Sequence, residues 1–311
     1  MNDYVKRIHL KTSGQDRQKL IDFCLKDEND QKLAIGWSSC YDAEHKSYDE
    51  FYVSVKKKYA RINHVLNAFR DAQEDDLFWT RDLEGFYWIC RVKKKAETCH
   101  NKDLKDLDIG AVLPVEAYKV SMRVPGQIKA SFNRPNSSTC ETIKSEDGRI
   151  LEYSKWIFNK KRKEKGKTDR YTVNKENTDG DFLSNLPDFD LEELVICYLQ
   201  LEMNYFVLSN SIARKSTTVN IECELVKRND GNQKAVVQVK AGEKTINAEE
   251  YREYAKAGYV VYFYVHNEKQ VIGLDEPTQM KIITKEALSK FYKKNKALLP
   301  ENITQWENLF Q

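Results

Sequence analysis

Apolar positions in the second half of the chain follow first a helical and then a strand spacing. Over 188–202 they recur at i, i+3, i+4 and i+7, which predicts an amphipathic helix. Asp190 is the expected N-cap, with Glu193 completing a capping box. The Asp-Gly pair in RNDGN predicts a hairpin between two alternating strands. The expected order is a helix, a strand, the hairpin, a helix and an apolar strand, over 188–202, 205–209, 217–228 with 233–241, 248–256 and 258–265.

The first half of the chain has a different pattern, in which short segments of alternating apolar and polar residues are rich in aromatic side chains. Strands are expected over 32–39, 76–95 and 111–120, and one helix over 54–69. A turn at Asp82–Gly85 divides the second segment into a hairpin. These elements predict a small antiparallel barrel. The expected fold class is therefore α+β, with an N-terminal β-barrel and a C-terminal mixed sheet flanked by helices.

Length and composition suit two globular domains in one chain. The 311 residues are 41% hydrophobic and 32% charged, and no segment approaches the ~20 apolar residues of a membrane span. Seven scattered cysteines without a CxxC pair argue against a disulfide framework, and the first residues lack the apolar segment of a secretory signal. We expect a cytoplasmic protein without a membrane partner.

Charge is unevenly distributed, although the net charge is only +3. Eight basic and two acidic residues lie within 155–170, and seven carboxylates without a basic residue follow within 176–193. We place a linker at 151–185, between an N-terminal domain, 1–150, and a C-terminal domain, 186–311. The basic run has two interpretations: a solvated linker face, or a strip contacting nucleic-acid phosphates. In the second interpretation the contacts come from Lys160, Lys161, Arg162 and Lys163.

Polar side chains interrupt the apolar strand AVVQVKAG at 235–242. Gln238 and Lys240 point to one face, and Glu222 on the preceding strand can meet them across the pair. Carboxylate, amide and carbonyl oxygens are ligands that Mg²⁺ accepts, and a neighbouring ammonium can orient a metal-bound water beside a phosphate. The alternative is that Gln238 and Lys240 form the solvent-facing half of an edge strand.

This arrangement, E-x15-Q-x-K on a hairpin after a helix with a glutamate, resembles the PD-(D/E)XK nuclease superfamily and its Mrr-type branch over about 186–275. The resemblance implies that Glu222 and Gln238 hold Mg²⁺, that Lys240 is the catalytic lysine, and that Glu193 supports the metal from the helix. Glu193 has the alternative role of a capping residue. The usual proline-aspartate is replaced by Ile221-Glu222, and Glu224 on the same strand face competes with Glu222. A homodimer is also implied, since two strands need two sites.

The N-terminal half resembles PUA-like domains of the EVE or YTH kind in IGWSS (35–39), DLFWTRDLEGFYWICRV (76–92) and VPGQIKASF (124–132). Such domains hold one modified or flipped base in an aromatic pocket. The resemblance implies pocket walls and hydrogen-bonding partners, and core packing is the alternative role of each tryptophan. The candidates are Trp37, Trp79 and Trp88 as walls, Ser38 and Thr80 as partners, and Arg81 as a phosphate contact.

Together these features predict a Mg²⁺-dependent DNA endonuclease, modification-dependent or sequence-selective, acting in bacterial defence. Two alternatives stay open. One is a catalytically inactive reader of modified DNA or RNA, because a glutamine at 238 lowers the charge of the site. The other is an enzyme that cleaves RNA.

Overall fold

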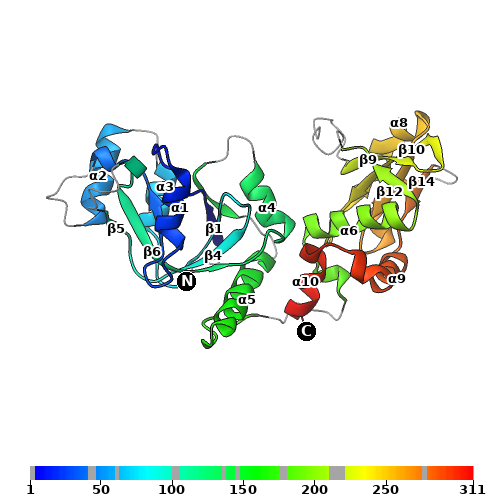
Figure 1. The fold of residues 1–311 in the computed structure, drawn as a ribbon. Coiled ribbons are helices and arrows are strands. Elements are labelled where there is room, and N and C mark those ends of the chain that lie inside the picture. Colours follow the sequence, from blue (N-terminus) through cyan, green and yellow to red (C-terminus); the bar gives the residue numbers. More distant parts are fainter. Residues whose placement is uncertain are drawn as a thin grey trace. The chain divides into compact units, whose positions relative to one another are not determined.

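The computed structural model describes residues 4–40, 47–59, 63–99, 106–134, 138–143, 148–174, 181–209, 221–274 and 279–310 (Figure 1). The chain divides into two compact units, residues 1–174 and 175–311. The described part has mixed α and β structure in both units, in agreement with the expected α+β class. No helix in these ranges has the length and apolar character needed to cross a bilayer.

Unit 1 is built on a curled, half-barrel sheet with the strand order β2-β6-β4-β3-β1-β7. The predicted hairpin is confirmed, since β3 and β4 pair antiparallel around Asp82–Gly85. The prediction of an antiparallel barrel is only partly right, because β1 pairs parallel with β3 and the described strands form an open path. The strands are β1 (Val5–Ile8), β2 (Lys32–Ile35), β3 (Leu77–Arg81), β4 (Tyr87–Val92), β5 (Glu97–Thr98), which also pairs with β6, β6 (Ala111–Lys119) and β7 (Cys140–Ile143).

Helices cover this sheet and enclose a core that includes Leu20, Phe51, Leu66, Phe69 and Phe78, none of them more than 1% exposed. The structure has two helices where one was expected over 54–69. The first begins earlier than expected, and the two are separated by residues that include 60–62, which lie outside the described ranges. The helical segments are α1 (Arg17–Leu25), η1 (Ser38–Cys40), α2 (Tyr48–Lys58), α3 (Asn63–Arg70), α4 (Gly126–Asn133) and α5 (Arg149–Glu164).

Helix α5 corrects the predicted linker over 151–185. Its apolar residues, Tyr153, Ile157 and Phe158, are at most 5% exposed, and its lysines occupy the remaining faces. The helix contacts β1 and β4 of unit 1, and Asn159 Nδ2 donates to the carbonyl of Tyr171 at 2.7 Å. Residues 149–174 therefore belong to unit 1. The dense positive charge hid the helical apolar stripe in the sequence.

Unit 2 contains the predicted mixed sheet, with the order β14-β12-β10-β9-β8. Pairs β8/β9 and β9/β10 are antiparallel, whereas β10/β12 and β12/β14 are parallel. The predicted helix, hairpin and apolar strand are confirmed, although 217–220 lie outside the described residues. The sheet elements are β8 (Tyr205–Val207), β9 (Cys223–Lys227), β10 (Asp230–Val239), β12 (Val260–Tyr264) and β14 (Met280–Ile282), and a separate pair is formed by β11 (Ile246–Asn247) and β13 (Val271–Ile272).

The helices of unit 2 pack on both this sheet and one another. Helix α6 contacts β8 and β10, and the C-terminal helix α10 packs on α6. Trp306 and Leu309 of α10 are buried, with at most 1% exposure. The helical segments are η3 (Leu183–Asn185), α6 (Asp188–Leu201), η4 (Ala248–Tyr251), α8 (Arg252–Lys256), η5 (Glu268–Gln270), α9 (Lys285–Asn295), η6 (Lys296–Leu298) and α10 (Glu301–Phe310).

Asp190 does not cap α6, contrary to the prediction from sequence. The helix begins at Asp188 with Pro187 before it, which places Asp190 in the first turn. Its side chain is fully buried and accepts hydrogen bonds from Asn302 Nδ2 and Trp306 Nε1, both at 2.9 Å. The carboxylate therefore joins α6 to α10 rather than closing the end of its own helix.

Replacing Asp190 by alanine is expected to destabilise unit 2 by roughly 2–4 kcal/mol, because two buried N–H groups lose their acceptor. Urea unfolding followed by tryptophan fluorescence measures this loss. Asp188→Ala is the matched control, because Asp188 lies on the same helix but forms an exposed ion pair with Lys244. Equal stability of the two variants would contradict the structural role of Asp190.

Candidate functional site

The centre of the candidate site is a direct pairing of Glu222 with Gln238 at the end of the β9–β10 hairpin. Cys223 lies opposite Val237 in the register, and the amide N–H of Glu222 donates to the Val237 carbonyl at 2.8 Å. Gln238 Nε2 donates to Glu222 Oε1 at 3.1 Å. Glu222 is 8% and Gln238 1% exposed, so this polar pair lies in the protein interior.

The register also distinguishes Glu222 from Glu224. Glu224 lies opposite Val236 and points to the same face, but two residue pairs along the hairpin from Gln238. Alternation places Lys240 on this face as well, immediately after β10 ends. Its amide N–H donates to the Tyr264 carbonyl at 3.0 Å, and its half-buried side chain has no hydrogen bond or ion pair within the described ranges. The structure thus pairs Glu222 with Gln238, whereas the position of Lys240 on the same face follows from strand alternation and stays a prediction.

The two ends of the Gln238 amide group have different surroundings. Its Nε2 donates both to Glu222 Oε1 and to the Val239 carbonyl, each at 3.1 Å. Its Oε1 is buried and accepts no hydrogen bond from the described residues. An orphaned buried acceptor is costly, and in a native structure it calls for an explanation such as a bound ion.

Glu222, Gln238 and Val239 offer a carboxylate, an amide oxygen and a main-chain carbonyl, which are ligand types that Mg²⁺ takes. In this structure the Gln238 nitrogen faces the other two oxygens, so the amide group would have to turn for all three oxygens to meet a cation. In the described ranges no three His, Cys, Asp or Glu side chains gather closely enough to hold a metal ion. A cation held here would therefore depend on the amide and carbonyl oxygens and on water.

Tyr251 is a neighbour of this pair that the sequence interpretation missed. It lies in η4 and is 4% exposed, and its ring meets Phe263 edge-on at 5.1 Å. Phe263 is the β12 partner of Gln238 in the register. Burial raises the pKa of Tyr251, and the charges of Glu250 and Glu222 raise it further, so the phenol stays protonated at neutral pH. The only sequence signal was an aromatic residue in the helical segment after the hairpin.

Glu193 is engaged elsewhere in unit 2. Its Oε2 accepts a hydrogen bond from Asn302 Nδ2 at 2.6 Å, beside the Asp190 carboxylate that the same amide contacts. Neither its capping role nor a contact with Glu222 is found among the described residues. Glu193 therefore contributes to the packing of α10 on α6.

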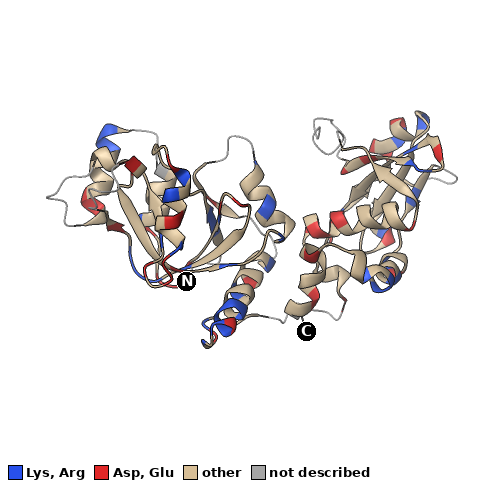
Figure 2. Cartoon of the chain, viewed as in Figure 1, with Lys and Arg blue, Asp and Glu red and all other residues tan. Residues whose placement is uncertain are grey.

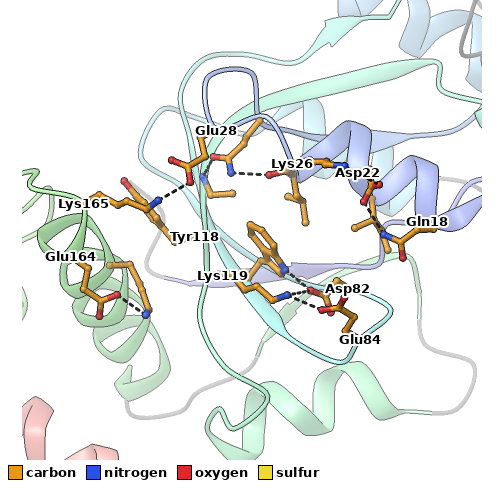
Figure 3. A pocket seen from close by; sticks show the side chains of 16 residues that line it. Gln18, Asp22, Lys26, Glu28, Asp82, Glu84, Tyr118, Lys119, Glu164 and Lys165 are labelled. Atoms are coloured by element: carbon orange, nitrogen blue, oxygen red, sulfur yellow. Dashed lines mark hydrogen bonds and ion pairs between the residues drawn. The ribbon is translucent and has the colours of Figure 1, made fainter.

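A second candidate site is a cavity of about 460 Å³ in unit 1, shown in Figure 3. Half-buried Trp88 lines it, together with Tyr118 and residues of α1 and α5. The indole Nε1 of Trp88 donates to Asp82 Oδ2 at 2.9 Å, which fixes the orientation of the ring. Lys161 also lines the cavity, so Trp88 and Lys161, predicted separately, share one site.

The charges around this cavity are paired. Lys119 contacts Glu84 at 2.9 Å and Asp82 at 3.4 Å, and Lys161 contacts Glu164 at 2.8 Å. Figure 3 shows Lys119 pointing toward Asp82 and Glu84, with Glu164 on the neighbouring helix α5. An aromatic wall with polar groups of both signs suits a planar, hydrogen-bonding ligand better than a free anion.

Two other predicted pocket residues are part of the core instead. Trp79 is fully buried, stacks on Tyr153 at a centroid distance of 6.1 Å and donates to Ser154 Oγ at 2.9 Å. Thr80, the next residue on β3, is also fully buried. The role of pocket wall is wrong for Trp79, because α5 covers this part of the sheet and closes it to ligands.

Trp37 and Ser38 form a tight turn rather than part of the Trp88 cavity. Trp37 is half-buried and has φ +67°, a left-handed conformation that is uncommon for a bulky residue. Asp108 Oδ1 accepts from the amide and the hydroxyl of Ser38 at 2.9 and 2.7 Å. A β-carbon at Gly36 would lie 2.9 Å from the same carboxylate, which explains glycine there. Strain of this kind is concentrated at functional sites, and it keeps Trp37 a candidate.

The basic run is largely neutralised by carboxylates, although Lys and Arg gather on the second half of α5 (Figure 2). Arg162 Nη1 contacts both oxygens of Glu116 at 2.6 Å, and Lys163 contacts Asp169 at 2.9 Å. Burial alone would raise the pKa of Glu116, but hydrogen bonds from Tyr118 and Lys167 and nearby positive charges lower it to about 2. Arg162 is thus a structural ion-pair residue, which weakens the interpretation of 160–163 as a phosphate strip. Exposed Lys160 lies over the Trp156 ring at 5.2 Å.

Arg81 is half-buried where β3 ends and has no carboxylate partner in the described part of the chain. Its Nη1 donates to Asn133 Oδ1 at 3.0 Å, and its guanidinium lies 5.7 Å from the centre of the Phe132 ring. His9 packs edge-on against the same ring at 5.2 Å. Burial lowers the pKa of His9 to about 4, and three arginine charges act in the same direction: Arg7, Arg17 and Arg81.

The stability of unit 1 is expected to fall as the pH decreases from about 6.5 to about 4. Folding holds His9 neutral, so the unfolded chain binds the additional proton in this range and is favoured by acid. The contribution is complete above the ordinary pKa and is lost as the pH approaches the lowered one. Thermal unfolding midpoints between pH 4 and 7 test this, and His9→Phe should flatten the dependence. A variant with the same pH profile as the native protein would exclude His9 as its source.

Comparison with known proteins adds no identity to this geometry. No family model, no curated protein and no solved structure matches the chain. Function is therefore inferred from the two sites alone.

Proposed function

We propose that this protein is a Mg²⁺-dependent endonuclease of the PD-(D/E)XK kind, in which unit 2 cleaves DNA and unit 1 recognises a base. The observation that carries the proposal is the buried Glu222–Gln238 pair, whose Gln238 Oε1 has no partner among the described residues, with Lys240 following on the same strand face. Such a group of oxygens and one cation at a strand end has no evident role in packing.

Each residue of the site would have a separate role in phosphodiester hydrolysis. Glu222, Gln238 and the Val239 carbonyl would hold the ion, which when bound supplies a Lewis acid for the phosphate and acidifies water. Lys240 can donate to a non-bridging phosphate oxygen, or orient the attacking water by hydrogen bonding. Tyr251 and Phe263 enclose the pair on the side of the sheet that faces η4, which limits access of bulk water.

Unit 1 would select the substrate through the Trp88 cavity. Its volume of about 460 Å³ is in the range of small-ligand pockets, and one flipped base offers the planar, polar surface that the lining suits. Modification-dependent or sequence-selective cleavage, as in bacterial defence, is the activity this pairing of units supports. A homodimer would allow both strands to be cut.

One observation favours the alternative of a non-catalytic reader. The amide of Gln238 already satisfies Glu222 by a hydrogen bond, and it does so without any ion. A protein that retained only the scaffold of a nuclease would keep this contact.

Incubation with supercoiled plasmids separates the two functions. Plasmids without modification, with methylated cytosine and with methylated adenine are each exposed to the full chain in Mg²⁺ or in EDTA. Cleavage of at least one plasmid, in Mg²⁺ only, is expected. Binding without cleavage of any of them, in Mg²⁺ or Mn²⁺, would support the reader and overturn the nuclease.

A further inference from the structure

We infer that Arg17 and Arg81 form a phosphate clamp on unit 1, a binding site for a phosphodiester group of the nucleic acid strand. The choice of a phosphodiester rests on the proposed function, whereas the clamp itself rests on the geometry around Phe132 and Leu10. Neither arginine lies in the hairpin site of unit 2.

Three basic side chains converge at this place from different elements. Arg81 and His9 both contact the Phe132 ring, at 5.7 and 5.2 Å from its centre. Arg17, the first residue of α1, donates from Nε to the Leu10 carbonyl at 3.1 Å, one residue after His9. Segments that are distant in the sequence thus bring the Arg81 guanidinium and the His9 imidazole to one ring, while Arg17 binds the main chain at the residue after His9.

The like charges of Arg17 and Arg81 act on one another. Burial lowers the pKa of Arg17, and the charge of Arg81 lowers it further. Both side chains are half-buried, so solvent screens this repulsion less than it would at an open surface. A bound anion would remove the repulsion.

Neighbouring carboxylates are committed to other partners. Asp82 accepts from Trp88 and from the Phe86 amide, and Asp16 accepts from the Lys19 amide as the N-cap of α1. Glu141, the acid that affects His9, pairs with buried Arg7 at 3.0 Å. Within the described ranges, no carboxylate lies within 4 Å of the guanidinium of either clamp arginine, unlike Arg162 in the basic run.

Free donors remain on both clamp residues. Within the described ranges the hydrogen bonds of Arg17 use only Nε, and those of Arg81 use only Nη1. The remaining N–H groups of each planar fork match two phosphate oxygens, which is why arginine is preferred for this ligand. Gln18 and Asp82, the residues that follow the clamp arginines in the sequence, line the Trp88 cavity (Figure 3).

The test measures binding of a fluorescein-labelled 15-base-pair DNA duplex by the full chain in EDTA, as a function of salt. Arg17→Gln and Arg81→Gln should each weaken binding roughly eightfold at 0.1 M salt and lower the slope of log K against log salt by about 1. The double variant should lower the slope by about 2. Arg17→Lys with Arg81→Lys should retain most of the slope, because the charges stay.

Arg70→Gln is the matched control, since Arg70 is a basic residue of the same unit that pairs with Asp71 at 2.9 Å. Its affinity and slope should equal those of the native protein, and thermal unfolding confirms that each variant is folded. Should Arg81→Gln fail to fold, Arg17→Gln alone decides the matter, because its side chain makes one hydrogen bond to a carbonyl.

Failure of the clamp and failure of the nuclease give different results. Native affinity and slope in the folded glutamine variants would overturn the clamp, even if Mg²⁺-dependent cleavage is observed. Loss of affinity in these variants would support it, even if no plasmid is cleaved. Absence of DNA binding by the native protein at every salt concentration would overturn it as well.

Discussion

Replacing Lys240 by alanine is expected to reduce Mg²⁺-dependent DNA cleavage by roughly 10²–10³-fold, with little change in DNA affinity. Strand alternation places Lys240 two residues from Gln238 on the face of the Glu222–Gln238 pair, and its ammonium has no carboxylate partner in the described structure. A donor aimed at developing phosphate charge acts mainly in the transition state, so its loss lowers kcat rather than binding. Single-turnover cleavage of a labelled duplex in Mg²⁺ measures the effect.

Lys234→Ala provides the control from the same strand. Lys234 lies six residues earlier on the same face of β10, but it is exposed and lies over the Tyr259 ring at 5.9 Å. Removing it subtracts the same charge from the hairpin without touching the site. Cleavage that persists at the native rate in Lys240→Ala would remove the assigned active site, whereas equal losses in both variants would point to a general electrostatic effect.

The hairpin site could be predicted because strand alternation is a short-range rule. The turn signal predicts the hairpin, and alternation predicts which residues share a face. The pairing of Glu222 with Gln238 also depends on an irregularity between Asp230 and Lys234 that shifts the register after the turn, which the sequence does not reveal. The choice between Glu222 and Glu224 required the exact register of β9 against β10, which the sequence does not determine. Tyr251 was missed because η4 approaches this face only through tertiary packing.

Contacts between distant segments account for the incorrect predictions. The apolar face of α5 has helical spacing, yet its eight basic neighbours made the segment resemble a solvated linker. Asp190 has the composition and position of a helix cap, and only the docking of α10 converts it into a buried acceptor. Trp79 and Trp88 lie in the same hairpin, but the helix that packs on β3 and β4 buries one and leaves the other beside a cavity.

The Gln238→Glu substitution is expected to have the second large effect, a loss of stability that depends on Mg²⁺. This change places a carboxylate opposite Glu222 at a position that is 1% exposed, and it removes the N–H group that satisfied Glu222. Without a divalent ion, unit 2 should lose about 3 kcal/mol of stability near pH 8, because the two buried charges lack compensation. Acidification should reduce the loss, since one of the two carboxylates then binds a proton.

Mg²⁺ should reverse this destabilisation, because binding to the folded state alone stabilises it in proportion to RT ln(1 + [Mg²⁺]/Kd). Scanning calorimetry of the full chain in EDTA and in 5–10 mM Mg²⁺ (roughly the range that saturates a weak carboxylate site) measures the recovery. Gln238→Leu is the control, since it removes the amide and adds no charge, so its unfolding midpoint should respond little to Mg²⁺. A Gln238→Glu midpoint that is as low in Mg²⁺ as in EDTA would mean that Glu222, residue 238 and the Val239 carbonyl do not form a cation site, and that the hairpin pair serves only to specify the register of the sheet.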